Sequence, residues 1–70
     1  MPLIDRSNNE VRVETLVTRE DGRDSRGGKL YEISPPSEND PDGAVFVIWS
    51  GDSYGTWEKP KVIGAAFKSV

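Results

Sequence analysis

The feature that most constrains this chain of 70 residues is one uninterrupted apolar run, Ala44 to Trp49. The run, Ala-Val-Phe-Val-Ile-Trp, is rich in β-branched and aromatic residues, which favours a strand over a helix. Because it contains no polar position, we expect both faces of this strand to be covered. It therefore predicts the central strand of a small sheet, with Trp49 in the core.

Four further segments have the composition of strands. In the clearest of them, residues 11–18, β-branched residues alternate with polar ones, and only Leu16 interrupts the polar face. In the last, Gly64 indicates a bend, a bulge or a close backbone contact. The three segments that follow residues 11–18 are, in chain order, 29–34, 54–57 and 61–67.

The remaining segments read as loops or as an end of the chain. Residues 1–9 are expected to form a flexible N-terminal segment, although Leu3 and Ile4 could also pack onto the edge of the domain. Residues 10–70 then form a single small β domain. Residues 19–28 make a loop of mixed charge, and residues 37–43 make an acidic one.

Together these segments predict an all-β fold, either a small, strongly twisted antiparallel sheet or a partly open barrel of about five short strands. Residues 47–57, with the sequence Val-Ile-Trp-Ser-Gly-Asp-Ser-Tyr-Gly-Thr-Trp, resemble the strand-turn-strand of SH3-like and Tudor-like barrels. This resemblance implies an SH3-like, partly open barrel.

The sequence offers little material for catalysis or metal binding. It has neither cysteine nor histidine, which excludes disulfides and the common zinc and copper ligand sets. Residues 38–43 have some of the spacing of a calcium loop, but position twelve is Trp49 instead of the bidentate Glu. We therefore expect no metal, no cofactor and no enzymatic activity.

Charge and hydropathy narrow the setting. Nine basic and twelve acidic residues give a net charge of −3. A protein that binds the phosphate backbone of nucleic acid typically carries an excess of basic residues instead. The longest apolar run has six residues, too few to span a membrane, and no signal peptide is evident. We expect a cytoplasmic protein that binds neither membrane nor nucleic acid.

Two groups of residues are candidates for contact with a partner protein. The arginines of the charged loop form the first, and the alternatives for them are a plain solvated loop or contact with nucleic acid. Aromatic residues beside the turn at 50–53 form the second, and the alternative for these is packing in the core. The candidates are Arg19, Arg23, Arg26, Tyr54 and Trp57.

The function expected from these features is that of a non-enzymatic protein that occupies a surface of a larger partner. In size and character the chain is similar to small phage-encoded proteins that inhibit or redirect host machinery such as bacterial RNA polymerase. This similarity implies a steric regulator of transcription and carries over no particular residue. A nucleic-acid-binding barrel and a small virion component are the alternatives, and the oligomeric state stays open.

Overall fold

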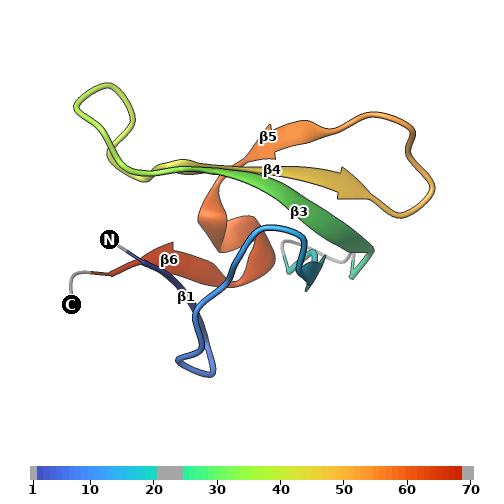
Figure 1. Cartoon of the computed structure of the whole chain (residues 1–70), viewed down its shortest axis with the longest axis horizontal. Coiled ribbons are helices and arrows are strands. Elements are labelled where there is room, and N and C mark those ends of the chain that lie inside the picture. Colours follow the sequence, from blue (N-terminus) through green and yellow to red (C-terminus); the bar gives the residue numbers. More distant parts are fainter. Residues whose placement is uncertain (1, 21–24, 69–70) are drawn as a thin grey trace.

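In the computed structural model, residues 2–20 and 25–68 are described, and they form two antiparallel sheets. The larger sheet has the strand order β2–β3–β4–β5, and the smaller one pairs β1 with β6 (Figure 1). A short 3-10 helix, η1, connects β5 to β6. The bounds are β1 Leu3–Asp5, β2 Leu16–Thr18, β3 Gly27–Ser34, β4 Ala44–Trp49, β5 Thr56–Glu58, η1 Pro60–Ile63 and β6 Ala65–Phe67.

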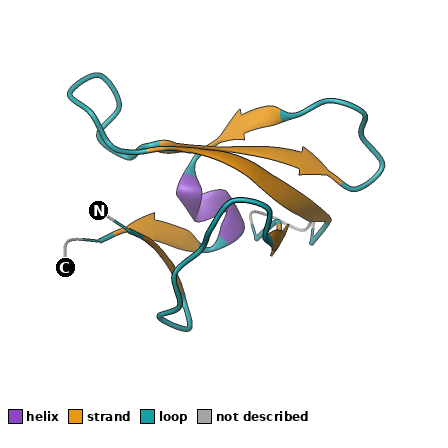
Figure 2. Ribbon diagram, viewed as in Figure 1, coloured by secondary structure: helices purple, strands orange, loops and turns teal. Residues whose placement is uncertain are grey.

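The predicted all-β class is confirmed, and no closed barrel forms over the described ranges. Figure 2 shows the two sheets as separate layers with η1 between them, and no strand or helix of the described residues lies on the far side of the larger sheet. Over the same ranges no helix is long and apolar enough to cross a membrane. The core lies between the layers and consists of Leu3, Val11, Leu30, Val45, Val47, Trp49, Val62, Ile63 and Ala65.

Strand β4 has the predicted bounds, but the prediction that both of its faces are covered is wrong. Val45, Val47 and Trp49 are buried toward η1 and the smaller sheet. The alternate positions, Phe46 and Ile48, are only partly buried on the opposite face. Because β1, β6 and η1 all pack on one side, the other side of β4 has no covering layer (Figure 2).

The strand predicted at 11–18 is also wrong in extent, since only Leu16–Thr18 is a strand. The chain turns at Glu14, whose φ of 69° lies in the left-handed region that a strand cannot use. The Val11 N–H donates to the carbonyl of Leu3 at 2.7 Å, and the Val11 side chain is buried there. Tertiary contact with β1 therefore outweighs the local β propensity of this segment.

The last predicted strand, 61–67, is divided. Pro60 begins the 3-10 turn, where its fixed φ fits and no N–H is required. Gly64 ends that turn at φ 68°, a conformation that glycine adopts without strain, so the predicted bend is confirmed. Only Ala65–Phe67 then continues as strand β6. The strand predicted at 54–57 begins two residues later and ends one residue later, at Thr56–Glu58.

Of the two arrangements expected near the N-terminus, the structure has the one in which Leu3 and Ile4 pack onto the domain. We expected 1–9 as a flexible segment outside the domain, but Leu3–Asp5 forms β1 and pairs with β6 in the register Leu3↔Phe67. The Leu3 side chain is 2% exposed and belongs to the core. The domain boundary expected after residue 9 therefore does not separate this segment from the domain.

Candidate protein-binding surface

Trp57 lies on the uncovered side of the larger sheet. In the register of β4 and β5 it faces Phe46, and the two rings meet edge to face with centroids 5.1 Å apart and an interplanar angle of 60°. Such aromatic pairs favour this geometry. The Trp57 side chain nevertheless stays 52% exposed, and Tyr54, in the loop before β5, is 66% exposed. The sequence left open whether these two side chains are exposed or packed in the core, and both are exposed.

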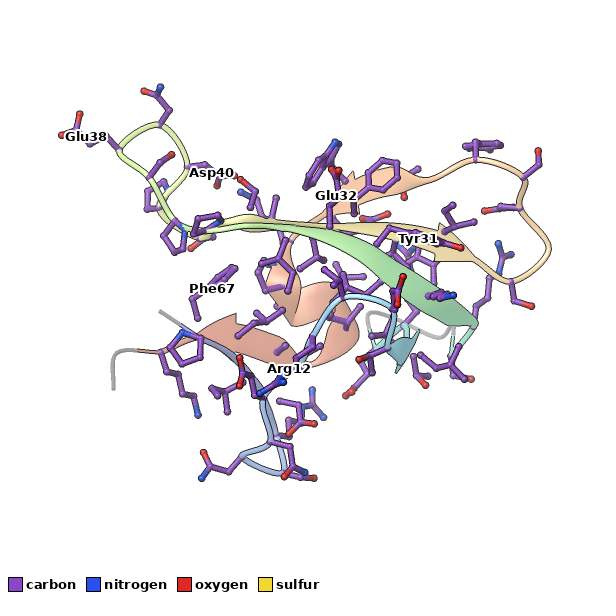
Figure 3. The ribbon with its side chains drawn as sticks, in the orientation of Figure 1. Arg12, Tyr31, Glu32, Glu38, Asp40 and Phe67 are labelled. Carbon is purple, nitrogen blue, oxygen red and sulfur yellow. The ribbon has the colours of Figure 1, made fainter. Side chains whose placement is uncertain are left out.

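A β-bulge in β3 adds a further aromatic ring to this side. Leu30 pairs with Val47 and Glu32 pairs with Phe46, so Tyr31 is an extra residue in β3 (Figure 3). A bulge of this kind sets two residues of one strand against a single residue of its neighbour. Tyr31 is exposed, and the Lys29 ammonium lies 5.4 Å from its ring centroid. Lys29 and Tyr31 therefore share one face of the strand.

A second row of side chains crosses the same face. Leu16 pairs with Lys29, and Lys29 pairs with Ile48, so the three side chains lie side by side across β2, β3 and β4. Leu16 is 81% exposed. Gly27 contributes no side chain beside this row, and a hollow of about 480 Å³ lies here between Leu16 and Ile48. The hollow is therefore walled by apolar side chains from β2 and β4.

We call this side of the larger sheet the outer face. Of its members, only Trp57 was predicted from the sequence as a contact residue. Phe46 and Ile48 were expected to lie in a strand covered on both sides. One signal did exist: Leu16 is the single apolar residue on the polar side of the 11–18 alternation. The outer face consists of Leu16, Lys29, Tyr31, Glu32, Phe46, Ile48 and Trp57.

The predicted arginine site is not brought onto this face. The Arg19 guanidinium lies 5.4 Å from the ring centroid of Trp49, which is buried on the opposite side of the sheet. Arg26 forms an ion pair with Asp52 at 3.7 Å. Arg23 lies outside the described residues. The structure therefore places Arg19 in an internal contact and away from Trp57.

Most basic side chains near the surface also have acidic partners. Arg6 contacts Glu20 at 2.8 Å, and Arg12 contacts Glu10 at 3.2 Å. In the acidic loop, Asp40 accepts a hydrogen bond from Lys59 at 3.1 Å. This bond, followed by the charges of Asp40 and Asp42, raises the pKa of Lys59 above its ordinary value. Within the described ranges no three acidic side chains gather in a way that could hold a metal ion.

The chemistry available to the outer face is burial of apolar and aromatic area against another molecule. Its one cation, Lys29, and its one anion, Glu32, flank the aromatic rings. Comparison of the chain with protein families, with curated proteins and with solved structures finds no match. The outer face is therefore the feature of this protein that bears on its function.

Proposed function

We propose that this protein is a non-enzymatic regulator that binds a larger protein through the outer face and acts by covering the surface to which it binds. The observation that carries the proposal is the uncovered Phe46–Trp57 pair, together with Tyr31 and Leu16 on the same side of the sheet. Aromatic residues of this kind supply most of the binding energy at protein interfaces. Their exposure in a chain of 70 residues has a cost in water unless a partner covers them.

Steric occlusion is the mechanism that fits such a surface. A protein that binds through one face of a sheet covers the partner's surface there and excludes a competing factor from it. Bacterial RNA polymerase is the candidate partner, and a phage protein that redirects host transcription is the candidate role. Both rest on the similarity in size and character described above, and both are tested directly by binding to the purified enzyme.

The first experiment measures binding of the tagged protein to bacterial RNA polymerase core and holoenzyme by biolayer interferometry. The proposal expects a one-to-one complex that Trp57→Ala weakens by about 30-fold, the effect of a 2 kcal/mol hot spot. Val13→Ala is the matched control, because Val13 is an exposed apolar residue outside every strand. Equal loss in both variants would contradict the assignment of the outer face.

A second experiment identifies the partner without assuming that it is the polymerase. A photo-crosslinking amino acid replaces Trp57 in one variant and Val13 in the other, and each protein is irradiated in bacterial lysate. The proposal expects one adduct from position 57 that is absent from position 13. If neither position gives an adduct while single-stranded oligonucleotides bind at low salt, the chain is a nucleic-acid-binding protein and the proposal is wrong.

A further inference from the structure

One backbone edge of strand β6 has no partner strand in the described chain. Lys68 N–H donates to the Pro2 carbonyl at 3.1 Å, so in this antiparallel ladder the hydrogen-bonded pairs are Pro2 with Lys68 and, two residues on, Ile4 with Ala66. In the alternate pairs, Leu3 with Phe67 and Asp5 with Ala65, the two residues make no backbone hydrogen bonds to each other. The backbone groups of Ala65 and Phe67 therefore point away from β1.

The far edge of β1 confirms this alternation. The Leu3 carbonyl accepts from Val11 N–H at 2.7 Å, and Asp5 N–H donates to the Asn9 carbonyl at 2.9 Å. Leu3 and Asp5 are the residues opposite Phe67 and Ala65. The backbone groups of Leu3 and Asp5 that point away from β6 are thus hydrogen-bonded to residues 9–11. On the β6 side, no strand of the described chain pairs with Ala65 or Phe67.

The neighbouring acidic loop does not fill this edge. Its backbone bonds are internal: Ser37 N–H donates to Asp40 at 2.9 Å, and Gly43 N–H donates to Asp40 at 3.1 Å. Pro36 and Pro41, which face β6, have no N–H to donate. The loop therefore borders the edge of β6 without pairing with it, and the Phe67 side chain extends from β6 to Gly43 at the end of the loop (Figure 3).

Between the loop and β6 lies a hollow of about 340 Å³, which we call the β6 groove. Lys59 in its lining is already held by Asp40 and Asp42. Lys61 has no ion pair with any residue in the described ranges. The groove is lined by Pro36, Pro41, Asp42, Lys59, Lys61, Ala65, Ala66 and Phe67.

We propose that the β6 groove binds an extended peptide segment of a partner protein, which adds to β6 as a strand and sets an acidic side chain beside Lys61. An unpaired strand edge is a template for pairing with another extended backbone. The uncompensated Lys61 charge favours a carboxylate on that ligand. A second copy of this chain fits less well, because its own β6 is bordered by the same loop. This site is on the smaller sheet and does not depend on the outer face.

The probe is a library of random linear peptides, selected by mRNA display on the immobilised full chain. The proposal expects enriched acidic peptides whose binding protects the amides of Ala65 and Phe67 from hydrogen exchange. Chemical synthesis gives the decisive variant, with an N-methyl group on Phe67, which removes an outward donor and leaves the bonds to β1 intact. We expect about tenfold weaker peptide binding for this variant, as for loss of one hydrogen bond.

Lys61→Glu is expected to weaken the same peptides, whereas Trp57→Ala is expected to leave them bound, since Trp57 lies on the other sheet. Failure to enrich any peptide, or equal binding to the N-methyl variant, would overturn the proposal. So would peptides lost with Trp57→Ala, which would belong to the outer face. A dimer that protects Ala65 and Phe67 without peptide, detected by sedimentation, would replace the proposed ligand with a second copy.

Discussion

The Arg19 guanidinium packs over the indole of Trp49, with 5.4 Å between Cζ and the ring centroid. The Nε1–H of the same indole donates to Glu58 Oε2 at 3.4 Å, and the Thr56 hydroxyl donates to that oxygen at 2.7 Å. Arg19 Nη1 lies 4.0 Å from Glu58 Oε2. The buried Trp49 ring therefore contacts both Arg19, which follows β2, and Glu58 of β5. These are the two edge strands of the larger sheet.

Replacement of Arg19 by alanine is expected to destabilise the fold by about 1 kcal/mol, because a partly desolvated cation–π contact is lost. Urea unfolding followed by tryptophan fluorescence measures the change. Arg12→Ala is the matched control, since its ion pair with Glu10 is exposed and such pairs contribute little. Equal stability of the two variants would show that the Arg19–Trp49 contact contributes nothing measurable.

Two adjacent glycines in β3 are expected to respond differently to alanine. At Gly28 a Cβ would lie 2.7 Å from Trp49 Cε3 and 2.9 Å from Val47 Cγ1, so overpacking should cost about 1–3 kcal/mol. At Gly27 the nearest atom is the Val17 carbonyl oxygen at 3.9 Å, and alanine fits. Thermal unfolding of Gly28→Ala and Gly27→Ala measures the difference. If Gly28→Ala is as stable as the wild type, the packing of Trp49 against β3 is wrong.

Leu3→Ala tests whether the N-terminal strand belongs to the core. Because Leu3 is 2% exposed, we expect a loss of about 2–5 kcal/mol, which approaches the whole stability of so small a domain. Leu16→Ala is the same substitution at a residue that is 81% exposed, and it is expected to change the free energy of unfolding by less than about 0.5 kcal/mol. Denaturant titration compares the two, and similar small effects would mean that β1 is dispensable.

The Lys59 pKa is expected to fall toward 10.5 in Asp40→Asn, because the hydrogen bond and charge of Asp40 are the main causes of its rise. The side-chain Cε shift of Lys59, followed by NMR through alkaline pH, measures it. A raised folded pKa means that the stabilisation is complete below the unfolded value and is lost as pH rises through the folded one. An unchanged Lys59 pKa in Asp40→Asn would exclude Asp40 as the cause.

Several features of the fold followed from local sequence alone. The bounds of β4, the burial of Trp49 and the bend at Gly64 were all predicted, because each depends on neighbouring residues and their backbone preferences. The sequence did not decide whether Tyr54 and Trp57 are exposed, because a position beside a turn does not determine which side of the sheet is covered. The members of the outer face other than Trp57 could not be predicted in this way.

What the sequence by itself determined is that this chain forms strands around a small apolar centre without disulfides. Only the tertiary structure decided which side of those strands is covered. Phe46 and Val47 are neighbours in one apolar run, yet Val47 is buried toward η1 and the smaller sheet whereas Phe46 lies on the uncovered side. The β-bulge that adds Tyr31 to the outer face depends on how β3 pairs with β4. The pairing of β1 with β6 brings together the two ends of the described chain. Such long-range pairing leaves no mark in local periodicity, because period and propensity describe a strand and not its neighbours.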